Sequence, residues 1–257
     1  MAKHDPGPPP TVATHLAALP SYAAWKSALW YDWGPIHYRG RLNKSARVLC
    51  IAQDPGATER IAGRTLVGDA GQRVQGFLSK LGLTRSYVCL NAFAYAVIPS
   101  KMAQAEPLLT NAAQVAWRNQ LFGLVTGPKL QAIVAFGKKA QDVVALWPGH
   151  GGVPIVKVPH PSSHDPVALI NAWRQAVITL RGVVTPDSVA KSKGPNYSAA
   201  FTAADYAAIP RADLPYGVPA ALGDDAWMRA LDPAHPSSVR RPDPDDRHTL
   251  IWKVPAS

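Results

Sequence analysis

Polar side chains that can do chemistry stand directly after short apolar runs at three places in this sequence. They are Gln53 and Asp54 at the first place, Asn91 at the second and His160 at the third. A carboxylate, an amide and an imidazole supply a negative charge, a paired donor and acceptor, and a hydrogen-bond donor near neutral pH. Such a set can stabilise a developing cation, recognise the edge of a planar ligand and stabilise a developing anion.

The apolar runs alternate with stretches of helical spacing, and this alternation decides how the polar side chains are placed. The runs occupy 48–52, 87–91, 132–136 and 154–158, and the helical patterns occupy about 68–80, 107–125, 138–147 and 166–180. The pattern predicts an α/β fold, a single domain with a central four-stranded parallel sheet flanked by helices on both faces. Because the carboxyl ends of parallel strands meet at one edge of a sheet, we expect Asp54, Asn91 and His160 to converge there.

Composition divides the chain into three parts. Residues 1–10 are polar and rich in proline, and we expect them to be disordered. Residues 11–184 carry the alternating pattern of the α/β domain. Residues 185–257 lose that pattern and are rich in Pro, Ala and Asp, but isolated aromatic residues recur along them. We therefore expect an irregular extension that wraps the core.

Positive charge is concentrated in the part of the chain that holds these motifs. The net charge is +10, of which residues 1–185 contribute +11 and residues 186–257 contribute −1. This distribution favours a polyanionic partner, above all DNA, through neutralisation of phosphates, although a basic solvated surface has the same composition. The Lys138 and Lys139 pair that follows Gly137 is a candidate phosphate contact.

Cysteine content and hydropathy bound the remaining classes of protein. The two cysteines, Cys50 and Cys89, fall in predicted buried strands and indicate a reducing, cytoplasmic location. They are too few for a four-cysteine cluster, and the histidines lack neighbouring acidic or cysteine ligands, so we expect neither a metal nor a cofactor. No apolar run approaches the roughly 18 residues of a membrane helix, and residues 1–10 carry no signal-peptide pattern. We expect a monomer without membrane association.

The motifs at the strand ends resemble those of the uracil-DNA glycosylase superfamily. Residues 53–56 read Gln-Asp-Pro-Gly and share Gln-Asp-Pro with the family-1 motif Gly-Gln-Asp-Pro-Tyr-His and Pro-Gly with the family-4 motif Gly-Glu-Ala-Pro-Gly. Glu59 and residues 67–71 are similar to the continuation of the family-4 motif, and residues 160–162 read His-Pro-Ser, like the second signature. Asn91 stands where the superfamily has its base-reading asparagine. The iron–sulfur cysteines of family 4 are absent.

The resemblance implies a base-excision repair enzyme that flips uracil out of DNA and hydrolyses its N-glycosidic bond, leaving an abasic site. It implies that Asp54 favours the cationic sugar and orients a water, while neutral His160 donates a hydrogen bond to the uracil oxygen. Asn91 would read the adjacent carbonyl and N–H of uracil. Gln53 and Leu66 are expected to complete the substrate pocket.

Ala52 stands in place of the first glycine of the motif and crowds the backbone slightly, and three further positions depart from the pattern of the relatives. Gly56 lines the expected pocket where family 1 has a tyrosine that blocks the methyl group of thymine, so this exclusion must come from elsewhere. Leu66 stands where relatives stack a phenylalanine on the base. Ser162 and Ser163 are candidate DNA contacts, but Ser163 begins a stretch without the bulky wedge that fills the gap left by a flipped base.

Other interpretations of the same residues remain open. Asp54 before a proline also suits a turn, Asn91 suits a strand-end cap, and Ser162 with Ser163 suits a helix cap. A low-turnover binding protein for uracil-containing or abasic DNA would carry the same pocket without efficient cleavage. A doubly wound hydrolase of small nucleotides would carry similar strand ends without affinity for DNA. The expected partner is DNA containing uracil or abasic sites.

Overall fold

A five-stranded sheet lies at the centre of the computed structural model of the protein. The structure describes residues 4–189, 192, 194–219 and 222, and the backbone of 239–240 and 251–252. The strands are β1 (Tyr38–Gly40), β2 (Val48–Ala52), β3 (Tyr87–Asn91), β4 (Ala132–Phe136) and β5 (Ile155–Val158), in the spatial order β1-β3-β2-β4-β5. β2 to β5 are mutually parallel, so the predicted α/β fold is confirmed.

The edge strand β1 was not predicted, because three residues reading Tyr-Arg-Gly carry no strand pattern of their own. β1 becomes a strand by pairing antiparallel with β3, where Tyr38 lies opposite Leu90 and Gly40 opposite Val88. The sheet therefore has one strand more than the sequence predicts, and it is mixed rather than purely parallel.

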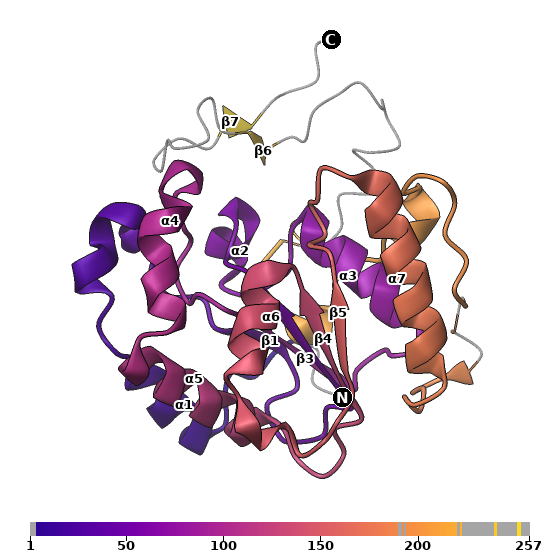
Figure 1. The fold of residues 1–257 in the computed structure, drawn as a ribbon, viewed down its shortest axis with the longest axis horizontal. Helices are drawn as coiled ribbons and strands as arrows, with labels where there is room; N and C mark the ends of the chain where they lie inside the picture. Colours follow the sequence, from indigo (N-terminus) through magenta and orange to yellow (C-terminus); the bar gives the residue numbers. More distant parts are fainter. Residues whose placement is uncertain are drawn as a thin grey trace.

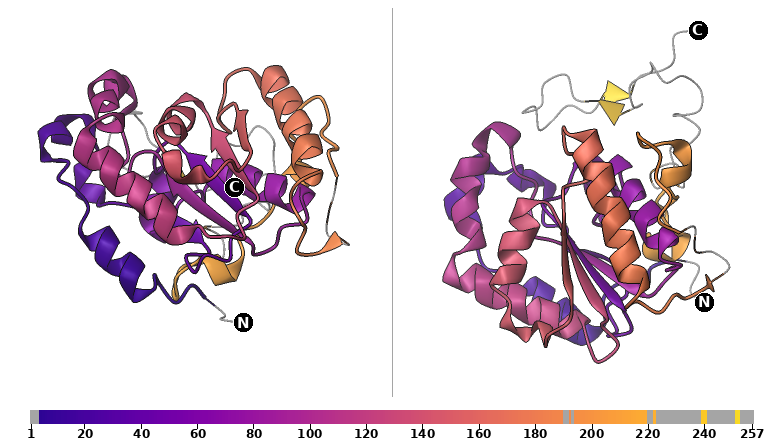
Figure 2. Two further views of the ribbon diagram at one scale, coloured as in Figure 1. Left: turned by 60° about the horizontal axis from the view of Figure 1, so that its bottom comes forward. Right: turned by 45° about the vertical axis from the view of Figure 1, so that its right-hand side comes forward.

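Helices cover both faces of the sheet (Figure 1). They are α1 (Pro10–Ala17), α2 (Ala57–Ala62), α3 (Asp69–Lys80), α4 (Met102–Ala105), α5 (Ala112–Val125), α6 (Lys138–Ala145) and α7 (Pro166–Arg181). Figures 1 and 2 show α1, α5 and α6 on one side of the sheet and α3 and α7 on the other. Short 3₁₀ turns join several of them, and a separate two-stranded ribbon pairs β6 (Val239–Arg240) with β7 (Ile251–Trp252).

The central strands are apolar along their whole length because each face meets a different set of helices. Leu49 and Ile51 of β2 belong to the buried cluster on the α5 side, and Val48 and Cys50 to the cluster on the α3 and α7 side. All five residues of β2 are buried. Burial on two faces is what turns a period-2 pattern into a continuous apolar run. No helix in the described part of the chain is long and apolar enough to span a membrane.

The first described residues lie against the domain, although their composition predicts disorder. The backbone N–H of Asp5 donates to the carbonyl of Leu214 at 2.9 Å. Its carboxylate accepts a hydrogen bond from the hydroxyl of Tyr38 at 3.0 Å and from Nε of Arg64 at 2.6 Å. These partners lie far away in sequence, so composition alone carries no sign of them.

Buried charges tie the described part of the 185–257 extension to the sheet. The carboxylate of Asp213, with no exposed side-chain surface, lies 3.2 Å from Arg39 and 2.6 Å from Arg41. The hydroxyl of Tyr87 also donates to it at 2.7 Å. A buried charge that loses its partner is strongly unfavourable, so Arg39 of β1 depends on a residue of the extension.

A second contact docks the extension on α3. Lys80 and Asp205 form an ion pair at 3.0 Å with both side chains about 3% exposed. The backbone of Asp205 lies so close to Gly76 that a Cβ there would be 1.8 Å from its carbonyl oxygen. Only glycine allows this approach. The described residues do not include 220–221, 223–238 and most of the chain after them. For those residues, wrapping of the core stays a prediction.

Candidate active site

A pocket of about 220 Å³ lies at the carboxyl ends of β2 and β5. Among the residues predicted to form the site, those that line it are Asp54, Gly56, Leu66, His160 and Ser162. The acid and the imidazole come from strands separated in the sheet by β4, and they meet because parallel strands end at the same edge. The predicted convergence of Asp54 and His160 is therefore confirmed.

Asp54 is held by hydrogen bonds to both carboxylate oxygens. The backbone N–H of Val97 donates to Oδ2 at 2.9 Å, and the side-chain amide of Gln53 donates to Oδ1 at 3.1 Å. β2 ends at Ala52, and Pro55 and Gly56 follow Asp54 in the turn that leads to α2. Gln53 thus contacts the site through Asp54 and is not among the residues that line the pocket. A carboxylate bound in this way keeps one orientation without help from a ligand.

His160 is a neutral imidazole with its proton on the nitrogen that is free to donate. Burial lowers its pKa to about 4, so the ring is uncharged at neutral pH. The backbone N–H of Ser162 donates to Nδ1 at 3.2 Å, which makes Nδ1 the acceptor nitrogen. The single ring proton is therefore assigned to Nε2. His160 can therefore donate a hydrogen bond from Nε2–H while the ring stays neutral.

Gly137 leaves space for His160 at the start of α6. Its φ of +87° lies in the left-handed region that glycine favours. A Cβ at this position would lie 3.0 Å from the Cβ of His160. A side chain at position 137 would therefore both strain the local backbone and displace the imidazole of His160.

Glu59 joins the two loops that form one wall of the pocket. Its Oε2 accepts the backbone N–H of Gly56 at 2.9 Å, while Oε1 accepts those of Val67 at 2.7 Å and Gly68 at 2.9 Å. The side chain is 7% exposed and lines the pocket itself. A Cβ at Gly56 would lie 2.8 Å from Oε2, so the glycine leaves room for this carboxylate. In the sequence, Glu59 was visible only as part of the resemblance.

Leu66 lines the pocket in a conformation that its neighbours impose. Its φ of +55° is left-handed, which is rare for a residue other than glycine. Gly71 of α3 lies so close that a Cβ there would be 1.9 Å from the carbonyl carbon and oxygen of Leu66. The Ala-Gly that opens α3 is thus explained by the close approach of the Leu66 backbone.

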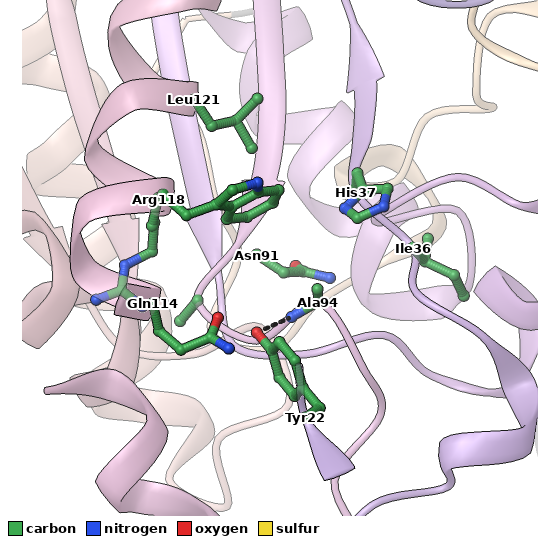
Figure 3. Close-up of a pocket in the computed structure, with 10 residues that line it drawn as sticks. Tyr22, Ile36, His37, Asn91, Ala94, Gln114, Arg118 and Leu121 are labelled. Atoms are coloured by element: carbon green, nitrogen blue, oxygen red, sulfur yellow. Dashed lines mark hydrogen bonds between the residues drawn. The ribbon is translucent and has the colours of Figure 1, made fainter. Parts of the chain in front are cut away.

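Asn91 lies in a different cavity from Asp54 and His160. It stands at the end of β3, and Figure 3 shows it among Tyr22, His37 and Gln114. Together they line a space of about 10 Å³. That volume holds about one water. Neither polar atom of its amide has a hydrogen-bond partner among the described residues. The predicted convergence thus brings two of the three side chains into one pocket, and Asn91 is only adjacent, paired in the sheet with Ala52 of the pocket lining.

Residues 39–166 match the family model of the uracil DNA glycosylase superfamily. The α/β domain belongs to this superfamily. No curated protein matches the sequence. The match runs from β1 to the first residue of α7 and includes Asp54, Leu66, Asn91 and His160. The matched domain is a DNA-repair glycosylase domain, a hydrolase that acts on damaged bases in DNA.

Of the four candidate DNA contacts, only Ser162 lines the pocket. Lys138, 77% exposed, pairs with Asp142 one helical turn along α6 at 2.5 Å. Lys139 pairs with Glu106, and neither lysine lines the pocket. Ser162 does line it, whereas the hydroxyl of Ser163 accepts the backbone N–H of Asp165 at 3.4 Å, before the start of α7. Contact of these four residues with DNA stays a prediction.

Arg73 of α3 links the C-terminal extension to the glycosylase site, a contact with no signal in the sequence. Its guanidinium donates to the carbonyl of Pro161 at 2.7 Å and to the hydroxyl of Tyr206 at 2.9 Å. It also lies 4.9 Å from the centre of the Phe201 ring. The His-Pro-Ser loop is therefore braced by residues from a part of the chain outside the match.

Proposed function

We propose that the protein is a uracil-DNA glycosylase, a monofunctional enzyme that hydrolyses the N-glycosidic bond of deoxyuridine in DNA and leaves an abasic site. The observation that carries the proposal is the pairing of a fixed carboxylate, Asp54, with a neutral imidazole, His160, in one pocket. Glycosidic cleavage leaves cationic character on the sugar and negative charge on the departing base. The pocket supplies a group for each charge.

Asp54 acts on the sugar in this proposal. Its carboxylate stabilises the cationic ring and orients the water that attacks the anomeric carbon from the face opposite the base. The hydrogen bonds from Val97 and Gln53 preorganise it, so no reorientation is required during the reaction. Water oxygen forms the new bond to the anomeric carbon, the electron pair of the broken bond leaves with uracil, and the proton that the water loses ends on the uracil anion.

His160 acts on the base. Negative charge develops on the uracil oxygen as the bond breaks, and Nε2–H of the neutral ring donates a hydrogen bond to it. Since the pKa of the ring is lowered to about 4, His160 acts as a neutral hydrogen-bond donor and not as a charged imidazolium acid. The Ser162 N–H on Nδ1 maintains this tautomer.

DNA is the proposed source of the base, and the base enters the pocket from an extruded position. The charge of +11 over residues 1–185 supports binding to the phosphate backbone. Ser162 at the pocket, with Ser163, Lys138 and Lys139, is proposed to contact the strand.

Asn91 is proposed to read the edge of uracil with its donor and acceptor. Its support is an amide without partners among the described residues, beside Ala52 of the pocket lining. The side chain must turn from the small cavity toward the base to do so. Asn91→Asp should then weaken discrimination between uracil and cytosine in DNA, and unchanged discrimination would remove Asn91 from the proposed site.

The test is a duplex oligonucleotide with one deoxyuridine, treated with the protein and then with alkali. We expect scission at the deoxyuridine, lowered at least about 100-fold by Asp54→Asn. Asp142→Asn, on the surface of α6 and outside the pocket lining, is the matched control; it releases Lys138 and should leave the rate at saturating DNA unchanged. Absence of scission with folded protein contradicts the proposal. Tight binding to abasic DNA with no more than one product per molecule would instead identify a binding protein.

A further inference from the structure

Trp30 is an aromatic wall of the active-site pocket that no sequence motif identifies. It lines the pocket together with Asp54 and His160, and its side chain is 2% exposed. It lies before β1 and outside residues 39–166, so the matched domain does not include it. The N-terminal segment therefore contributes directly to the site.

Backbone pairing places Trp30 beside the loop that also orients Asp54. Leu29 and Val97 form an antiparallel bridge, and the N–H of Trp30 donates to the carbonyl of Ala96 at 2.9 Å. The N–H of Ile98 donates back to the carbonyl of Ala28 at 3.0 Å. Val97, at the centre of this pairing, is also the residue whose N–H binds Asp54. The distance between the indole and the carboxylate is therefore set by one short ladder.

A second ring supports the indole. The ring of Trp33 lies with its centre 4.2 Å from that of Trp30, and the guanidinium of Arg60 lies 5.2 Å from the Trp33 ring. Trp30 packs in a small buried cluster with Ala96 and Ile98. This packing holds the indole in place before any ligand arrives, so little side-chain entropy is lost when a base packs against it.

Leu66 cannot supply the same contact. It lines the same pocket but belongs to another buried cluster, on the α3 side, and its aliphatic side chain has no π-face. A base held in the pocket thus meets an aliphatic surface at Leu66 and an aromatic one at Trp30. Stacking of a nucleobase on an aromatic side chain contributes about 1–3 kcal/mol and works for any base.

We propose that Trp30 is the residue on which the extruded base stacks, an inference that rests on the proposed function. The expected contribution corresponds to a loss of about 5- to 150-fold in binding when the ring is removed. Binding of free uracil reports this contact separately from bond cleavage, so the two proposals can fail independently.

The experiment measures the inhibition or binding constant of free uracil for three variants. Trp30→Leu should weaken it at least about fivefold, and Trp30→Phe should lose less because a ring remains. Trp147→Leu is the control, since Trp147 is also buried, 4% exposed, but follows the end of α6 and does not line the pocket. Equal uracil binding in Trp30→Leu and wild type overturns the proposal, whether or not the wild type cleaves DNA.

A measurement on the wild-type chain covers the case in which Trp30→Leu does not fold. The protein is labelled with 5-fluorotryptophan, and the fluorine resonance missing from Trp30→Phe identifies the indole. Addition of free uracil should shift that resonance more than the resonance of Trp147. A Trp30 signal that stays in place at saturating uracil overturns the proposal.

Discussion

Replacing Glu59 by glutamine should detach the Asp54 loop from the rest of the pocket while changing no atom of the reacting groups. In the native protein, one oxygen of Glu59 accepts from Gly56 and the other from Val67 and Gly68. The glutamine oxygen can replace only one of these oxygens. Facing Val67 and Gly68 it keeps two bonds, so this orientation is favoured, and the amide NH₂ then faces the N–H of Gly56.

The magnitude follows from that geometry. The lost bond joins a backbone N–H to a charged acceptor, which is worth about 1.5–3 kcal/mol, and the side chain is 7% exposed, so water does not replace it. Two donors now face each other, which places the expected loss of unfolding free energy at about 2–3 kcal/mol. For a domain of this size, each kcal/mol lowers Tm by about 2–4 °C, giving a decrease of about 4–12 °C.

The assay compares thermal unfolding with single-turnover cleavage of a deoxyuridine oligonucleotide at a temperature well below Tm. Because the Asp54–Gly56 turn is released, cleavage should fall even where the variant is fully folded. Glu106→Gln is the matched control, as Glu106 pairs with Lys139 and is 46% exposed, and it should stay within about 0.5 kcal/mol of wild type. A Glu59→Gln protein with wild-type Tm and rate would refute the inference that Glu59 holds the loop.

Three further predictions concern other parts of the molecule. Asp213→Ala leaves Arg39 buried without its counter-charge and should lower the free energy of urea unfolding by about 3–5 kcal/mol; a loss below 1 kcal/mol contradicts the buried pair. Gly137→Ala should reduce both Tm and cleavage because of its φ of +87° and its contact with His160, whereas Gly123→Ala, inside α5 with open space around it, should raise Tm slightly. The folded pKa of His160, about 4, lies below its ordinary value of 6.5, so the unfolded chain takes up the proton first and stability falls as pH decreases from 6.5 to 4. His160→Gln should remove up to about 3 kcal/mol of this pH dependence, and an unchanged difference between pH 7 and pH 4 would contradict the burial of a neutral ring.

The pattern of the sequence is sufficient to predict the parallel core. β2, β3 and β4 have the predicted bounds because strands buried on two faces must be apolar throughout, and that requirement is written in consecutive residues. The same argument predicts the meeting of Asp54 and His160, since it needs only parallel strands with polar residues at their ends.

Local sequence does not decide which cavity a side chain at the end of a strand faces. Asn91 was predicted from the same rule as Asp54, and it does lie at the end of its strand. Packing of α5 and of the segment before β1 then decides which space its amide faces, because Gln114 and His37 line that cavity. A strand-end rule predicts the edge of the sheet and leaves the choice of pocket to the neighbours.

The sequence by itself determined the fold class and the strand ends, because each depends on residues close together in the chain. The meeting of Asp54 and His160 then follows from the rule that parallel strands end at one edge of a sheet. Tertiary structure alone decided the strand β1, the buried Asp213–Arg39 pair and the Trp30 wall. Each of these joins positions that acquire a relationship only when the chain closes on itself. The physical reason is that burial arises only in the completed fold. A charge requires its partner only when it is buried, and a ring lines a pocket only when other segments enclose that pocket.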